Sequence, residues 1–337
     1  MILTLTLNPS LDRTIEIALL DRGAVIRAAA ARLDPGGKGV NVARALLANG
    51  IAGRAVIPYG GDEGRQLVHL LELAGLDMVT VPVAGRTRSN VTLAEPDGTI
   101  TKINEPGTAL SPQELDTIAE AVLTAARPSI TPPGDGPGEP AAADWVVASG
   151  SLPPEVPADV YARLCRRFAE AGINVAVDTS GPALACAVAA GPALVKPNLD
   201  ELAAVTGMAP RCVGDVVQAA EKLRAAGARA VLASLGSDGA VLVSGEGLWY
   251  GQAPVDEPRS SVGAGDAMLA GFLAGGARGP RALAEALAWG SAAVALPGSR
   301  VPAPADIDRT RVHVGPPDPA RPLTSPTPKS PGEARPR

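Results

Sequence analysis

The chain has 337 residues, 46% of them hydrophobic but only 2% aromatic, so one large domain or two modest ones must have a core of Ala, Val and Leu. Its 30 Lys and Arg against 35 Asp and Glu, without a long basic run, argue against nucleic acid or an anionic membrane as the main partner. Three scattered cysteines and two distant histidines leave little material for a zinc site or a His-based triad, and no apolar run reaches membrane-spanning length. The sequence therefore predicts a cytoplasmic protein that binds neither nucleic acid nor membrane.

In the first third of the chain, strand and helix patterns alternate, with two β-rich interruptions. Residues 2–7 alternate Thr with Ile or Leu, which predicts a strand that stops at Asn8-Pro9. The β-rich interruptions, residues 13–33 and 87–104, read as exposed strands and a β-hairpin that could form a small separate sheet. The remaining elements predicted here are a loop at 34–39, helices at 40–48 and 66–74, and a strand at 55–58.

The rest of the chain alternates more regularly. We expect helices at 112–126, 157–171, 182–190, 199–206, 215–226, 266–276 and 280–295. We expect strands at 145–149, 173–178, 193–196 and 229–234, followed by a β-rich piece at 240–251. Strands that alternate with helices predict a doubly wound α/β core with a mostly parallel sheet.

Two segments do not fit this pattern. Residues 128–143 are rich in Pro and Gly and predict a flexible surface insertion. From Thr310 onward the chain is rich in Pro, Arg and Ser with few apolar residues, which predicts a disordered tail over 310–337.

Polar or Gly-rich clusters follow five of the predicted strands. They lie at residues 8–12, 149–153, 178–181, 196–198 and 234–239. Each alone is an ordinary turn, but ligands of open parallel sheets bind outside the carboxyl ends of the strands. Five such clusters at one edge therefore indicate a site.

The segment 261–272 places Gly263-Ala264-Gly265-Asp266 directly before an apolar helix. Such a junction directs backbone N–H groups and the positive end of a helix dipole at one spot, which suits an anion. Asp266 could act as a general base beside a bound phosphate chain. An isolated motif of this kind is more often an N-capping Asp after a Gly turn, so the motif does not decide between the two.

The other chemistry at the predicted edge suits phosphate. Glycine loops at 36–39 and 236–239 offer bare amides, and Lys38, Arg88 and Lys196 offer cations. Asn198 and Glu201, one helical turn apart, could hold Mg²⁺ through water, or could simply form a capping box.

Taken together, these motifs resemble those of the ribokinase-like, or pfkB, carbohydrate kinases, from residue 1 to about residue 307. Within that family the chain looks most like 1-phosphofructokinases and tagatose-6-phosphate kinases. The motifs that carry the resemblance lie at residues 6–12, 35–44, 85–91, 149–154, 195–202, 234–236 and 261–266. The insertion and the tail are not part of the family pattern.

The resemblance implies a three-layer α/β/α sandwich with a mostly parallel central sheet and a small β-sheet lid. The kinase domain would span 1–309, with the lid from about 12–34 and 86–105. It implies that Asp266 is the catalytic base and that residues Gly263, Ala264, Gly265 and Asp266 form an anion hole for the transferring phosphoryl group.

The resemblance also implies binding roles. Residues matched to the sugar phosphate are Asp12, Arg27, Gly36, Gly37, Lys38, Asn41, Arg88, Asn90 and Ser149. Residues matched to the nucleotide are Lys196, Asn198, Ser234, Gly236, Ser237, Gly239 and Gly265, with Glu201 and Asn198 reaching Mg²⁺ through water. The adenine pocket would be lined from 255–258 and from 291–297.

The activity that follows is ATP- and Mg²⁺-dependent phosphorylation of fructose 1-phosphate at its 6-hydroxyl. Tagatose-6-phosphate kinase and 6-phosphofructokinase activities are the alternatives, because the motifs do not fix which end of the sugar carries the original phosphate. A non-catalytic sugar-phosphate sensor is a more distant alternative, although an intact Asp266 argues against it. The exposed hairpin edge, together with the family, predicts a homodimer formed through the lid.

Overall fold

A computed structural model describes residues 1–126 and 144–324, so the predicted insertion and the last part of the tail lie outside the described residues. The described chain contains a ten-stranded sheet ordered β14-β13-β12-β11-β10-β9-β8-β1-β4-β5. Seven strands are parallel: β5 (Met78–Pro82), β4 (Gly53–Tyr59), β1 (Ile2–Thr6), β8 (Trp145–Ser149), β9 (Asn174–Asp178), β10 (Leu194–Val195) and β11 (Ala230–Ser234). Three antiparallel strands complete one edge: β12 (Ala240–Ser244), β13 (Gly247–Gln252) and β14 (His313–Gly315).

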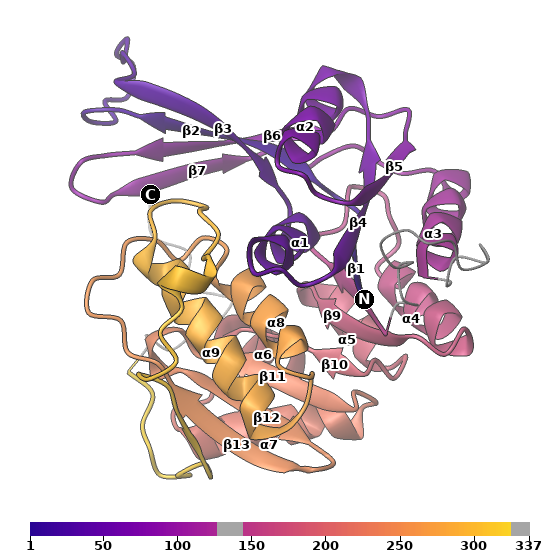
Figure 1. Ribbon diagram of the computed structural model, residues 1–337, viewed down its shortest axis with the longest axis vertical. Coiled ribbons are helices and arrows are strands. Elements are labelled where there is room, and N and C mark those ends of the chain that lie inside the picture. Colours follow the sequence, from indigo (N-terminus) through magenta and orange to yellow (C-terminus); the bar gives the residue numbers. More distant parts are fainter. Residues whose placement is uncertain (127–143, 325–337) are drawn as a thin grey trace, which may run out of the picture.

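Helices cover both faces of this sheet (Figure 1). One face packs against α3 (Pro112–Ala126), α4 (Val160–Glu170), α5 (Gly181–Val188), α6 (Leu199–Thr206) and α7 (Val213–Ala225). The other packs against α1 (Lys38–Ala48), α2 (Gly61–Leu73), α8 (Ala264–Ala274) and α9 (Gly279–Ala295). Because side chains alternate along a strand, Val175 and Val177 of β9 enter one core while Ala176 enters the other. The fold is therefore the α/β core with a mostly parallel sheet that the alternation predicts, in the three-layer form that the family resemblance implies.

A separate four-stranded sheet, which we call the lid, projects from the layers (Figure 1). Its order is β3-β2-β6-β7, with β2 (Ser10–Glu16), β3 (Ala30–Gly36), β6 (Arg88–Ala94) and β7 (Ile100–Asn104). The two β-rich interruptions of the sequence thus form the small sheet that was expected. The hairpin β6–β7 is confirmed, whereas the second strand of the interruption expected at 13–33 begins only at Ala30 and continues beyond it to Gly36.

The prediction of disorder from Thr310 onward is wrong for residues 310–324. β14 pairs with β13, and the segment after it donates and accepts backbone hydrogen bonds with residues 211–214. Low apolar content suggested a disordered chain, but backbone hydrogen bonds to an open sheet edge and to a helix terminus do not depend on side-chain hydropathy. Of the helices in the described residues, none combines the length and apolarity needed to cross a bilayer.

Candidate active site

The five polar clusters that follow strands meet at one edge of the large sheet. Each is in contact with the next. Asn8 Nδ2 lies 3.4 Å from Ser151 Oγ, Gly150 N donates to Asp178 O at 2.9 Å, and Lys196 Nζ lies 3.0 Å from Asp178 Oδ2. A parallel bridge joins Asn198 to Ser234. The parallel strands therefore assemble the site that the sequence predicted at their carboxyl ends.

A cavity of about 660 Å³ opens at this edge, within the size range of small-molecule sites. The predicted nucleotide residues all line it: Lys196, Asn198, Ser234, Gly236, Ser237, Gly239 and Gly265. The segment Gly263, Ala264, Gly265 and Asp266 forms another part of its wall. Its wall also includes Val255, Pro258 and Val294, which belong to the two segments expected to line the adenine pocket.

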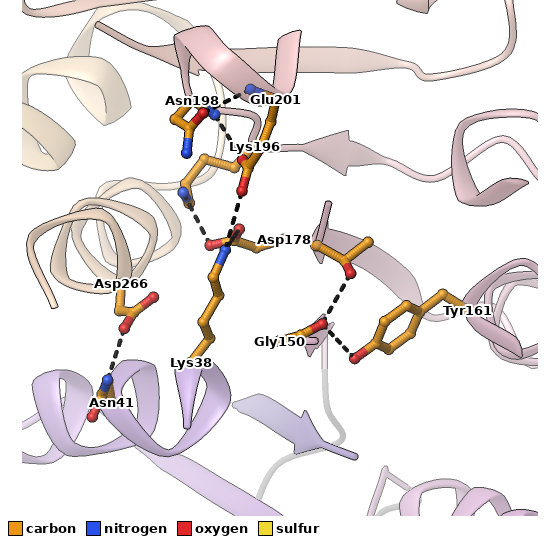
Figure 2. Close-up of polar contacts among 10 residues, drawn as sticks. Lys38, Asn41, Gly150, Tyr161, Asp178, Lys196, Asn198, Glu201 and Asp266 are labelled. Atoms are coloured by element: carbon orange, nitrogen blue, oxygen red, sulfur yellow. Dashed lines mark hydrogen bonds and ion pairs between the residues drawn. The ribbon is translucent and has the colours of Figure 1, made fainter. Parts of the chain in front are cut away.

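Asp266 lies in the first turn of α8, but it does not cap the helix. The N-cap is Gly263, whose φ of 76° is the left-handed conformation that glycine adopts readily. The Asp266 carboxylate is buried and accepts a hydrogen bond of 2.8 Å from Asn41 Nδ2, on α1 (Figure 2). The capped-turn alternative is therefore wrong for this residue.

Burial, reinforced by the charge of Asp178, raises the pKa of Asp266 to about 7. The hydrogen bond from Asn41 and the charges of Lys196 and Lys38 oppose this shift without cancelling it. A carboxylate with a pKa near 7 is divided between its two protonation states at neutral pH. This is the range in which a general base is most effective.

Asp178, at the end of β9, holds two lysines from different parts of the fold. Its fully buried carboxylate lies 2.7 Å from Lys38 Nζ and 3.0 Å from Lys196 Nζ (Figure 2). Burial by itself would raise the pKa of Asp178, but the two lysine charges outweigh it and lower that pKa. The carboxylate therefore stays ionised and fixes both ammonium groups on the cavity wall.

Lys38 was matched to the phosphate already on the sugar, yet it faces the same cavity as the nucleotide residues. Its Nζ contacts Asp178 and lies 3.7 Å from Glu201 Oε1. Burial disfavours its ammonium, but Asp178 and Glu201 more than compensate and raise its pKa. Lys38 is thus a permanent cation between the lid and the predicted phosphate site.

Three residues predicted to bind sugar phosphate gather on the lid near its root. Asn90 Nδ2 donates to Asp12 Oδ1 at 2.9 Å, and Arg88 donates through Nη2 to Asn8 O at 3.0 Å. Two buried atoms of this group, Arg88 Nε and Asn90 Oδ1, have no hydrogen-bond partner within the described residues. Buried polar groups normally have partners, so these two atoms point to a polar ligand.

Backbone geometry explains two of the predicted glycines. A Cβ on Gly36 would collide with the Asp12 carboxylate, and one on Gly37 would lie 2.8 Å from Thr6 Cγ2. Gly37 is also the N-cap of α1, and its φ of 116° is a backbone conformation that residues with a side chain rarely adopt. Gly37 thus brings the first turn of α1, with Lys38 and Asn41, against β1, while Gly36 lets β3 approach the Asp12 side chain of β2.

Of the residues predicted to bind the sugar phosphate, only Lys38 lines the cavity, and Ser149 and Arg27 belong neither to its wall nor to the lid cluster just described. The Ser149 side chain is fully buried, and its Oγ lies beside the α1 backbone at Gly39. Arg27 is exposed and precedes Ala30, the first residue of β3. The root of the lid is at the opposite end of the β2–β3 pair, where Ser10 pairs with Gly36.

Asn198 and Glu201 form the capping box that was the alternative to a metal role. Asn198 Oδ1 accepts from Glu201 N at 2.8 Å, and Glu201 Oε2 accepts from Asn198 N at 2.9 Å. Within residues 1–126 and 144–324, no group of three or more His, Cys, Asp or Glu side chains could hold a metal ion. The donor set still suits Mg²⁺ through water, because Glu201 Oε1 takes no part in the capping box and can accept a hydrogen bond from a water of the ion's hydration shell.

The residue missed as a site candidate is Asp178. It belongs to one of the five polar clusters, at residues 178–181 after a predicted strand, but neither the motifs nor the resemblance gave it a role. The available signal was an acidic residue at the carboxyl end of a strand, flanked by other polar clusters. Its two lysine partners could not be identified from spacing, since Lys38 is 140 positions away.

A three-layer α/β fold with helix-terminal amides, fixed lysines and a buried carboxylate at one sheet edge is the arrangement expected of a phosphotransferase of the ribokinase-like class. The pfkB family carbohydrate kinase model matches residues 5–129 and 138–305. The chain belongs to the pfkB family of carbohydrate kinases.

The chain is also similar to individual phosphofructokinases. A 1-phosphofructokinase of Rhodobacter capsulatus is 37% identical over 81% of this chain and 82% of its own. The ATP-dependent 6-phosphofructokinase isozyme 2 of Escherichia coli is 36% identical over 89% of this chain and 94% of its own. The crystal structure of Escherichia coli phosphofructokinase-2 in complex with potassium superimposes with a TM-score of 0.82 at 34% identity, covering 90% and 96% of the two chains.

Proposed function

We propose that this kinase transfers the γ-phosphoryl group of ATP to the 6-hydroxyl of fructose 1-phosphate, giving fructose 1,6-bisphosphate and ADP. The observation that carries the proposal is the buried Asp266 carboxylate. It combines a pKa near 7 with a position on the first turn of α8, beside the cavity that Lys38 and Lys196 line. A base and phosphate-binding cations on one wall suit phosphoryl transfer to an alcohol.

In this mechanism Asp266 accepts the proton of the 6-hydroxyl as its oxygen bonds to the γ-phosphorus. The bond between that phosphorus and the β,γ-bridging oxygen breaks, and ADP leaves. The N–H groups of the first turn of α8, which lack intrahelical acceptors, stabilise the negative charge on the transferring group. Lys38 and Lys196, fixed by Asp178, add positive charge without having to be reoriented.

Mg²⁺ fits this scheme as a companion of the nucleotide. Glu201, with Asn198, would hold water molecules of its hydration shell, and the ion would neutralise charge on the β- and γ-phosphates. The capping box keeps both side chains in fixed positions at the start of α6.

The lid residues Asp12, Arg88 and Asn90 would bind the sugar phosphate. The buried, unpartnered Arg88 Nε supports this role, because a guanidinium suits a phosphate through several parallel hydrogen bonds. Fructose 1-phosphate is favoured because relatives named 1-phosphofructokinase are 34–37% identical to the chain. The 36% identical 6-phosphofructokinase supports the alternative, fructose 6-phosphate.

The deciding experiment compares kcat/KM for fructose 1-phosphate, fructose 6-phosphate and tagatose 6-phosphate with ATP and Mg²⁺. We expect the highest value for fructose 1-phosphate. A preference for either 6-phosphate would replace the proposed acceptor, and no turnover with any of the three would reject a hexose-phosphate kinase.

The lid also supports a homodimer. Strand pairing places Ile15, Leu33, Val91, Leu93 and Ile103 on one face, opposite the face that carries Asp12 and Asn90. Ile103 is 58% exposed, and the other four remain partly exposed. If a second copy covers this apolar face, apolar surface is removed from water, and this burial stabilises the dimer.

A further inference from the structure

The segment after β14, residues 316–324, which we call the C-terminal strap, crosses the edge of the large sheet toward the cavity. It lies beyond residue 305, where the family match ends. Residues here contact both the start of α7 and the short 3-10 turn η1 (Gly236–Asp238), which lines the cavity.

The strap is anchored on α7. The first two amides of this helix, Val213 N and Gly214 N, donate to Arg321 O at 2.9 Å and to Pro319 O at 3.0 Å. These N–H groups lack intrahelical acceptors, so the strap satisfies donors that would otherwise need water. Leu323 then packs against the main core. The close approach requires Gly214, because a Cβ there would lie 2.9 Å from Pro319 O.

From this anchor the strap reaches the nucleotide side of the site through Thr324. Its backbone N donates to Asp238 Oδ2 at 2.9 Å, and its hydroxyl donates to Asp238 Oδ1. Asp238, only 6% exposed, is the last residue of η1. A buried carboxylate that loses a hydrogen bond incurs a desolvation cost, so the position of Asp238 depends on the strap.

The backbone of the same turn is held from a second direction. Tyr250 Oη donates to Asp238 O at 2.8 Å, and Gln252 Nε2 does so at 3.4 Å. Arg321 of the strap in turn donates to Gln252 Oε1 at 2.7 Å and stacks 5.2 Å from the Tyr250 ring centre. The strap therefore contacts Asp238 directly and also contacts both side chains that hold its carbonyl.

We infer that the C-terminal strap is a positioning element of the nucleotide site: Thr324, through Asp238, fixes the turn 236–239 that contacts the nucleotide. The inference rests on the proposed function in so far as ATP occupies this cavity. The strap does not line the cavity that holds Asp266, and it is distant in the fold from the lid residues Asp12 and Asn90. Its loss therefore weakens nucleotide binding and leaves sugar-phosphate binding unchanged.

The test replaces the Thr324 hydroxyl by a methyl group, Thr324→Val, in the full chain. We expect the KM for ATP and the Kd for ADP to rise roughly three- to tenfold. A buried charged acceptor that loses a hydrogen bond is destabilised, and part of this cost appears as weaker nucleotide binding. The KM for fructose 1-phosphate stays unchanged, and amide hydrogen exchange over 236–239 becomes faster. Thr324→Ser restores the wild-type values, and Thr117→Val, which removes a hydroxyl bound to Gln113 O on α3, is the matched control.

Gly214→Ala provides an independent variant, because its Cβ displaces Pro319 without approaching the cavity. The same nucleotide-specific change is expected. If both variants lower the melting temperature but leave the ADP Kd and the exchange of 236–239 unchanged, the strap is only structural and the inference is overturned. Wild-type protein that binds neither ATP nor ADP would instead reject the proposed function, and with it the nucleotide role of the strap.

Discussion

Asn41 Nδ2 donates a 2.8 Å hydrogen bond to Asp266 Oδ2, joining residues 225 positions apart in the chain. It links the first turn of α1 to the first turn of α8. The bond orients the carboxylate and favours its ionised form, while burial and Asp178 favour the protonated form. The balance of these effects sets the pKa of the proposed base, and several predictions depend on it.

Replacing the base should abolish most turnover without preventing binding. Asp266→Asn keeps the shape of the side chain but cannot accept the hydroxyl proton. We expect kcat to fall by about 10²–10⁴ while Kd values for ADP and sugar phosphate change little. Steady-state kinetics and calorimetric titration measure both. Asp200→Asn, at an exposed position on α6, is the control, and unchanged turnover in Asp266→Asn would remove this residue from the mechanism.

The activity should require Asp266 in its ionised form. Since its pKa is about 7, kcat/KM should fall as pH decreases below 7, approaching about tenfold per unit. Asn41→Leu removes the hydrogen bond that lowers this pKa, so the acid limb should move to higher pH. Wild type and variant are measured with the same substrates, so the titration of the substrates affects both pH–rate profiles equally. A limb that stays in place would show that Asn41 does not tune the base.

Asp178→Asn should move the same limb in the opposite direction. Its negative charge raises the pKa of Asp266, so neutralising it lowers that pKa and extends activity to lower pH. The change also leaves Lys196, only 4% exposed, without its counter-ion, and we expect a loss of roughly 3 kcal/mol in unfolding free energy. Denaturant unfolding and pH–rate profiles test both effects. A shift to higher pH would contradict the assignment.

Gly265→Ala should separate stability from function. Gly265 is a helical residue of α8, and a Cβ there meets only Lys196 Nζ, at 3.3 Å. Alanine favours helix by up to about 1 kcal/mol over glycine, so the melting temperature should hold or rise. The added methyl group enters the proposed phosphate site, and kcat/KM for ATP should fall. Normal ATP kinetics would exclude a phosphate from this part of the wall.

Ile103→Lys should dissociate the proposed dimer. This side chain lies on the apolar face of the lid, whereas Ile100 in the same strand points to the other face. Ile100→Lys is therefore the matched control. Sedimentation at micromolar concentration should give a monomer for Ile103→Lys and a dimer for the wild type and the control. A monomeric wild type would refute the lid dimer.

Much of this protein could be predicted from local patterns. Strand periodicity and helix signals predicted the order of strands and helices along the chain and hence an α/β core, and residues 178, 196 and 234 were expected at one edge. The reason is geometric: the carboxyl ends of parallel strands share an edge, so sequence position after a strand implies position in space. The glycine turn before an apolar helix singled out Asp266 as a candidate, but its proposed role as a base came from the family resemblance and not from the local pattern.

Tertiary structure alone decided which charges meet. Lys38 contacts Asp178 and Glu201 because the start of α1, the end of β9 and the first turn of α6 meet, and nothing near residue 38 encodes that contact. Likewise the ordering of residues 310–324 comes from an open strand edge and unpaired amides of α7, which belong to distant segments. Local sequence determines backbone periodicity, whereas ion pairs and terminal docking depend on distances between elements that only the folded chain sets.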